Sequence, residues 1–178
     1  YTMAVLGVCT VVLASSIWIN PVAKGVPEIT KSETMQQIRD LVKEDPKAIW
    51  LVADMAYPAT NIPAMAGADC LNTTQTYPQK TRWEMLDPEG EYEDIYNRYC
   101  HIRASLGSKT MLELVSTDYV EVTLSPEDLK KLNIRYIVST NDFDERIAVG
   151  TTNIFTDSGI ELQKYYEGAQ LSIYRCVY

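Results

Sequence analysis

Apolar residues dominate the start of the chain, and no charged residue occurs before Lys24. The first 19 residues read YTMAVLGVCTVVLASSIWI, and about 20 mostly apolar residues span a bilayer as a helix. Trp18 lies near the end of this run, where an interfacial aromatic side chain is expected, and Asn20-Pro21 then ends the helix. The pattern predicts a transmembrane helix over residues 1–20. A buried core element and a processing signal are the two alternatives.

The next part of the chain predicts a helix, a strand and a long loop. Apolar residues recur at helical spacing over residues 35–42, and Thr30 and Glu33 have the spacing of a capping box that would begin this helix. Residues 48–53 read AIWLVA, a short continuous apolar run that is typical of a buried strand. Repeated Pro and Gly residues over residues 54–90 indicate loops.

The second half of the chain predicts further helices and most of the strands. Tyr92, Ile95, Tyr96, Tyr99 and Ile102 fall on one helical face. The segment Ser125-Pro126-Glu127-Asp128 is a helix start, with an N-cap serine, proline at the first position and acids in the first turn. Short apolar runs predict strands, the last two of which form a terminal hairpin, at residues 111–115, 119–124, 134–138, 162–166 and 171–177.

These elements predict an α/β or α+β fold, with a small mixed sheet and a few short helices, preceded by the apolar helix. The expected organisation is a last transmembrane helix over residues 1–20 and a soluble domain over residues 21–178. The chain begins with Tyr rather than Met, so we expect it to be part of a longer protein.

The composition is that of a folded domain with an acidic surface. Hydrophobic residues make up 46% and charged residues 22%, which excludes a disordered chain and a fibre. The 16 basic and 24 acidic residues give a net charge of -8, which argues against nucleic acid as a partner, because phosphate binding needs clustered Lys and Arg. His101 is the single histidine, which excludes a site built on two or more histidines. We predict no metal ion and no cofactor.

The chain has four cysteines, and none of them has the CxxC spacing of a zinc site. In an oxidising compartment Cys70 and Cys100 could form a disulfide. Such a bridge would close a loop of about 30 residues and contribute roughly 3–4 kcal/mol. The alternative is a set of separate reduced thiols, because four cysteines in 178 residues are too few for a disulfide scaffold.

Acidic residues lie beside the aromatic segment that follows the loop region. Carboxylates such as Glu91, Glu93 and Asp94 could hydrolyse a glycoside by proton transfer. The alternative is a solvated helix start, where acids are stabilised by the helix dipole. His101 has no Ser or Cys partner at motif spacing. We therefore predict no catalytic residue in this chain.

The tripeptide Asn72-Thr73-Thr74 matches the acceptor pattern for N-glycosylation. The pattern is meaningful only in a eukaryotic secretory context or a specialised bacterial one. Chance matches are common, so an ordinary loop segment is the alternative.

Three stretches together carry a resemblance to a known family. They are the apolar end running through Asn20-Pro21-Val22 to the strand AIWLVAD, the segment WEMLDPEGEYEDIYNRYCHI at residues 83–102, and the segment LSPEDLKKLNIRYIVSTND at residues 124–142. In this order they resemble the C-terminal tail of large bacterial polytopic membrane proteins related to the GT-C glycosyltransferases, including the YfhO-like group. The residues LNIRYI at 132–137 and LSIY at 171–174 fit the same tail.

The resemblance implies sugar transfer from a polyprenyl-phosphate-linked donor, with the catalytic acids in the membrane part outside this chain. The expected function is that of a non-catalytic extracytoplasmic C-terminal domain that assists binding of the acceptor glycan or of a partner. The expected partners are the membrane through residues 1–20, the rest of the parent membrane protein and a cell-envelope glycan. The alternative is a membrane-tethered protein-interaction or scaffold module with no sugar role.

Glycan contacts are predicted at aromatic residues in or beside the loop region, because aromatic faces next to polar side chains suit sugars. They are Tyr77, Trp83, Tyr92 and Tyr96. The alternative is that these rings belong to the core. Only Lys24 and Lys31 lie near the apolar helix, so no basic cluster marks a cytoplasmic side, which agrees with an extracytoplasmic location.

Overall fold

The structure is a computed structural model that describes residues 1–16, 27–143, 154–155 and 158–178. Its helices are α1 (Thr2–Ser16), α2 (Pro27–Thr30), α3 (Glu33–Glu44), the 3-10 helix η1 (Ala59–Asn61), α4 (Ile62–Met65), α5 (Lys80–Leu86), α6 (Glu93–Tyr96) and α7 (Pro126–Lys131). Its strands are β1 (Ile49–Val52), β2 (Asp69–Cys70), β3 (Thr74–Gln75), β4 (Cys100–Leu106), β5 (Met111–Ser116), β6 (Tyr119–Leu124), β7 (Ile134–Thr140), β8 (Glu161–Glu167) and β9 (Leu171–Val177).

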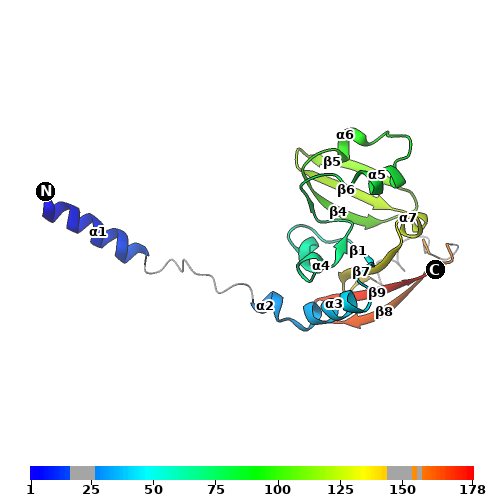
Figure 1. Cartoon of the computed structure of the whole chain (residues 1–178), viewed down its shortest axis with the longest axis horizontal. Helices are drawn as coiled ribbons and strands as arrows, with labels where there is room; N and C mark the ends of the chain where they lie inside the picture. The colour runs from blue at the N-terminus through cyan, green and yellow to red at the C-terminus, as the bar shows by residue number, and fades with distance from the viewer. Residues whose placement is uncertain (17–26, 144–153, 156–157) are drawn as a thin grey trace.

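The fold is mixed α+β, with two small mixed sheets in place of the single sheet that the sequence predicts. The five-stranded sheet has the order β2-β1-β7-β9-β8, and the four-stranded sheet has the order β3-β4-β6-β5. Strands β2, β1 and β7 are parallel, and the β8–β9 hairpin completes the larger sheet in antiparallel pairing. Figure 1 shows the two sheets as neighbouring parts of one body, with α7 at their junction.

The larger sheet is buried on both faces because its central strands are apolar on both sides. Trp50 and Val52 of β1 face a cluster that includes Ile38 and Leu41 of α3, so α3 covers this face of the sheet. Leu51 of β1 faces the opposite cluster. The continuous apolar run of β1 is therefore explained by burial on two sides.

The second cluster is shared by the two sheets. It contains Leu51 and Ile137 of the larger sheet, Ile102 and Val122 of the smaller sheet, and Leu129 of α7. The backbones of the two sheets also meet, because Ala53 and Ala104 form an isolated parallel bridge. The sheets are thus two parts of one core.

The start of α3 differs from the prediction. Its N-cap is Ser32, whose Oγ accepts a hydrogen bond from the Met35 backbone N–H at 3.2 Å. Thr30 ends the preceding helix α2, so the predicted box of Thr30 and Glu33 is wrong. At α7 the prediction is confirmed: Ser125 is the N-cap, Pro126 occupies the first turn, and Asp128 completes a capping box.

The predicted helix over residues 92–102 is wrong after its first turn. Helix α6 ends at Tyr96, and Cys100 begins the strand β4. In β4 the buried residues alternate with half-buried ones, as expected of a strand. The helical spacing of aromatic residues therefore arises from two short elements. The predicted strands near residues 48–53, 111–115, 119–124, 134–138, 162–166 and 171–177 are confirmed as β1, β5, β6, β7, β8 and β9.

Helix α1 is apolar, and its residues up to Ser15 are exposed. No helix within the described residues combines the length and the apolar content that crossing a membrane requires. Residues 17–20 of the predicted transmembrane helix lie outside the described residues.

Candidate functional site

The side chain of Asn72 helps to hold the segment after β2 to the larger sheet. The Asn72 Oδ1 accepts a hydrogen bond from the Val52 backbone N–H at 2.8 Å, and the Asn72 Nδ2 donates to the Val52 carbonyl at 2.7 Å. The Asn72 side chain is fully buried. It therefore pairs with β1 as another strand would, and the interpretation of Asn72 as a glycosylation acceptor is wrong.

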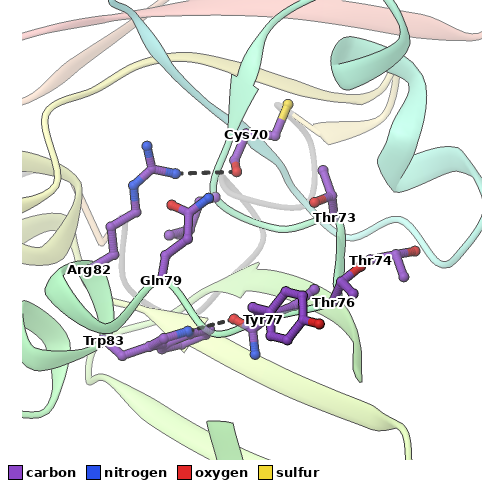
Figure 2. A pocket seen from close by; sticks show the side chains of 10 residues that line it. Cys70, Thr73, Thr74, Thr76, Tyr77, Gln79, Arg82 and Trp83 are labelled. Carbon is purple, nitrogen blue, oxygen red and sulfur yellow. Dashed lines mark hydrogen bonds between the residues drawn. The ribbon is translucent and has the colours of Figure 1, made fainter. Parts of the chain in front are cut away.

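Beyond Asn72 the chain forms β3, turns at Pro78 and enters α5, and a pocket lies between these elements. Its volume is about 230 Å³. Figure 2 shows Arg82 and Trp83 reaching in from α5, while Thr73 and Thr74 come from the segment around β3. Neutral hydroxyl and amide groups make up most of the polar lining, and they belong to Thr73, Thr74, Gln75, Thr76, Tyr77 and Gln79.

Trp83 and Gln75 form the rigid side of the pocket. The Trp83 Nε1 donates to the Gln75 Oε1 at 2.7 Å, and the Gln75 Nε2 donates to the Tyr96 carbonyl at 2.8 Å. The Trp83 and Tyr96 rings stack, with centroids 5.1 Å apart and planes 8° from parallel. Both amide ends of Gln75 are thus fixed, and the ring of Trp83 is held in one orientation.

Arg82 brings the only charge among the described residues that line the pocket, and that charge has a partner. Its guanidinium forms an ion pair with Asp69 and also donates to the Cys70 carbonyl at 3.4 Å. The side chain of Arg82 is only 16% exposed. The positive charge is therefore largely compensated, which favours a neutral ligand.

The four aromatic residues predicted to contact a glycan have different environments. Tyr77 is 83% exposed and lines the pocket together with Trp83. Trp83 and Tyr96 are 2% and 5% exposed, so their rings belong mainly to the core, as in the alternative interpretation. Tyr92 is half-buried against the shared core cluster, at the N-cap of α6. The structure thus brings Tyr77 and Trp83 together and places Tyr96 behind Trp83.

Gln75, Gln79 and Arg82 line the pocket but were not predicted as site residues. The sequence gives no distinct signal for them, because Gln79 and Arg82 follow Pro78 in a segment that also carries Lys80 and Glu84. Gln79 is exposed at the N-cap of α5 and makes no side-chain cap bond to that helix. Its amide is therefore available to a ligand.

The acids considered for catalysis do not lie in the pocket. Glu91, Glu93 and Asp94 are exposed at or just before the start of α6. His101 lies on β4, with its Nδ1 3.0 Å from the Thr74 Oγ1. In the part of the chain that the structure describes, no group of three or more His, Cys, Asp or Glu side chains could hold a metal ion.

Cys70 and Cys100 are free thiols in the structure. The structure therefore contains the separate thiols of the alternative interpretation and no disulfide between these two residues. The two side chains belong to different hydrophobic clusters, Cys70 with α3 and Cys100 with the shared core. Burial raises the pKa of Cys70 from 9.0 to about 12 and that of Cys100 to about 11. Both thiols are therefore protonated at neutral pH.

Comparison with known protein families identifies the family to which the chain belongs. Residues 28–178 match a family whose description is "Domain of unknown function (DUF7654)". The match covers every described element from α3 to β9, so the chain belongs to this family. No curated protein and no solved structure matched the chain.

Proposed function

We propose that residues 28–178 form a non-catalytic, glycan-binding domain on the extracytoplasmic side of a membrane glycosyltransferase-like protein. The observation that carries this proposal is the pocket between β3 and α5, in which neutral hydroxyl and amide groups surround the edge of a fixed tryptophan. Sugars present hydroxyl groups, which match the hydroxyl and amide groups of the lining, and apolar C–H faces, which match the exposed ring of Tyr77.

The size and charge of the pocket support a small neutral ligand. Its volume of about 230 Å³ lies below the 300–1,000 Å³ that is typical of sites for drug-sized ligands. It suits a single sugar ring. The ion pair of Arg82 with Asp69 compensates the positive charge, so a carboxylate or phosphate would have to compete with Asp69.

The role in sugar transfer and the membrane location rest on the resemblance of the chain to the tails of GT-C and YfhO-like proteins. In this proposal the domain holds an acceptor glycan near the membrane, and residues outside this chain carry out the transfer. The cell membrane, reached through residues 1–20, and the rest of the parent protein are the proposed partners.

The proposal is tested by calorimetric titration of the full chain with neutral oligosaccharides of glucose, mannose, galactose and N-acetylglucosamine. Because α1 is apolar and exposed, the chain is kept in a detergent without a sugar headgroup. We expect the double variant Thr76→Ala/Gln79→Ala to weaken binding about tenfold, since two hydrogen-bonding groups are lost.

Gln163→Ala is the matched control, because Gln163 is an exposed glutamine on β8 in the other sheet. It leaves the affinity unchanged. If no saccharide binds, or if the double variant binds as tightly as the unmodified chain, the glycan proposal is wrong.

A second candidate function is protein recognition through the outer edge of the smaller sheet. Strand β5 is the last strand of that sheet, and its exposed residues include Met111 at 52%, Leu114 at 38% and Val115 at 53%. An exposed edge strand with apolar side chains can accept a strand from a partner. In that case Leu114→Lys abolishes partner binding and leaves glycan titrations unchanged.

A further inference from the structure

Three rings from two segments of the chain gather beside the pocket. Tyr57 lies in the loop between β1 and η1, Tyr99 comes just before β4, and His101 lies on β4. The Tyr57 and His101 ring centroids are 4.3 Å apart, with the planes tilted by 34°. The Tyr99 ring meets His101 edge-on at 5.6 Å. We refer to Tyr57, Tyr99 and His101 as the aromatic shelf.

The shelf is open to solvent. Tyr57 and Tyr99 are each 51% exposed, although both rings contact the imidazole. Single exposed tyrosines are common on protein surfaces and need no explanation. Two of them arranged around a third ring, each with half of its surface in water, form a stacking surface that a ligand could cover.

One hydrogen bond connects the shelf to the pocket. The His101 Nδ1 lies 3.0 Å from the Thr74 Oγ1, and Thr74 also lines the pocket. The two residues face each other in the β3–β4 pairing. The backbone N–H of Thr74 donates to the Asn61 Oδ1 at 3.3 Å, so the strand between the two surfaces is held from both sides. The shelf and the pocket are therefore fixed relative to each other.

The pocket is too small for more than one ring, so a longer ligand has to continue along the surface. The aromatic shelf lies next to Thr74, so a longer ligand would pass from the pocket over Thr74 onto the shelf. Pyranose rings stack their C–H faces on aromatic rings, whereas the equatorial hydroxyls point outward to polar groups or water. A chain of linked sugar rings therefore fits a polar pocket followed by an aromatic shelf.

From this arrangement we infer that the ligand is a neutral oligosaccharide of at least two units, with one ring in the pocket and the next on the shelf of Tyr57, Tyr99 and His101. This inference rests on the proposed glycan-binding function and adds a second subsite to it. His101 lies between the pocket residue Thr74 and the two tyrosine rings, which it contacts.

The test compares saccharides of one, two, three and four units from each of the glucose, mannose, galactose and N-acetylglucosamine series, titrated into the full chain. We expect affinity to rise about tenfold from one unit to two or three, because the added ring stacks on the shelf. In Tyr57→Ala/Tyr99→Ala this rise disappears, and the affinity for one unit stays unchanged.

Two further variants show whether the rings themselves are responsible. Tyr57→Phe/Tyr99→Phe keeps both ring faces and retains the rise with chain length. Tyr165→Ala removes a tyrosine that is 44% exposed on β8 of the other sheet, and it leaves both affinities unchanged. Both tyrosines of the shelf are half-exposed, so far-UV circular dichroism of the alanine variant is expected to match that of the unmodified chain.

The results separate the inference from the function on which it rests. If the double alanine variant keeps the full rise with chain length, the shelf is not a subsite, and the pocket proposal stands. If saccharides of every length fail to bind the unmodified chain, the proposed function is wrong and the inference falls with it.

Discussion

The side chain of Asn72 acts as a strand partner for Val52. Its amide both accepts from and donates to the Val52 backbone, at a position where the larger sheet has no further main-chain pairing with β2. Because the segment that follows forms one wall of the pocket, this single residue connects the stability of the sheet to the geometry of the site.

Replacing Asn72 by alanine leaves a buried N–H and a buried C=O of Val52 without partners. We expect Asn72→Ala to lower the free energy of unfolding by about 2–4 kcal/mol, since each unsatisfied buried group costs about 1–3 kcal/mol. Urea unfolding measures this change. Asn97→Ala, at an exposed position, serves as the control and is expected to change stability by less than about 0.5 kcal/mol. A loss of the same small size at Asn72 would contradict its role.

The thiols of Cys70, Cys100 and Cys176 are buried and protonated, and burial raises the pKa of Cys176 to about 12. We expect a thiol reagent at pH 8 to leave these three unlabelled in the folded chain, whereas the exposed Cys9 reacts. After unfolding without a reductant all three react. If Cys70 and Cys100 stayed unlabelled until a reductant was added, they would form a disulfide.

Among the helices, α7 connects the two sheets, because it follows β6 of the smaller sheet and precedes β7 of the larger one. The Asp128 carboxylate accepts from the Ser125 backbone N–H and from the Ser125 Oγ at 2.8 Å each, and from the Thr110 hydroxyl before β5. Asp128 is 1% exposed. One buried carboxylate thus caps α7 and ties it to the smaller sheet.

Asp128→Ala removes the acceptor for three hydrogen bonds in a buried site. We expect a loss of about 2–4 kcal/mol in unfolding free energy, larger than the loss of about 1 kcal/mol expected for Ser125→Ala. Thermal or urea unfolding of the two variants measures both. Glu127→Ala is the control, because Glu127 is an exposed acid in the same turn. Equal effects at positions 127 and 128 would show that helix-dipole charge alone is involved.

Elements with strong local patterns could be predicted from the sequence, and those with conflicting patterns could not. The N-cap at Ser125 and the apolar run of β1 have one interpretation each, and both are confirmed. The strand β4 was missed because its residue Ile102 also continues the helical spacing of Tyr92, Tyr96 and Tyr99. The alternation of Cys100, Ile102 and Ala104 with polar residues competes with that spacing, and tertiary packing decides between them.

At the scale of the whole molecule, one core cluster joins two sheets. No local sequence pattern predicts the division into two sheets, because contacts such as the bridge between Ala53 and Ala104 join residues far apart in the sequence. The pocket has the same origin, since β3 is only two residues long and its position depends on pairing with β4. Sequence reasoning could therefore place the site in the loop region, but not choose Gln75, Gln79 and Arg82.

Because of the buried thiols, the free energy of unfolding of the chain depends on pH in the alkaline range. Their pKa values are raised from 9.0 to about 11 at Cys100 and about 12 at Cys70 and Cys176, so the native state holds protons that the unfolded chain has lost. The stability that the buried protonated thiols contribute is fully present below about pH 9 and is lost as pH rises through 11 to 12. Each thiol adds a slope of at most about 1.4 kcal/mol per pH unit.

Urea unfolding between pH 8 and pH 11 measures this dependence. We expect the free energy of unfolding to fall above about pH 9. At each pH the chain is expected to unfold in a single cooperative transition, because the two sheets share a core. In Cys70→Ala/Cys176→Ala the curve is flatter, although the variant is less stable at every pH. An unchanged slope in that variant would show that other groups govern the alkaline loss.

The central claim is that the pocket between β3 and α5 binds a neutral glycan, and Trp83 reports on it directly. In the full chain labelled with ¹⁵N-tryptophan, the indole N–H signal of Trp83 is assigned by Trp83→Phe and followed during titration with the neutral oligosaccharides. We predict that this signal shifts, because its acceptor Gln75 Oε1 lines the pocket, and that the signal of the buried Trp50 in the other cluster stays in place. A Trp83 signal unmoved by every oligosaccharide, or one that moves only together with Trp50, would contradict the claim.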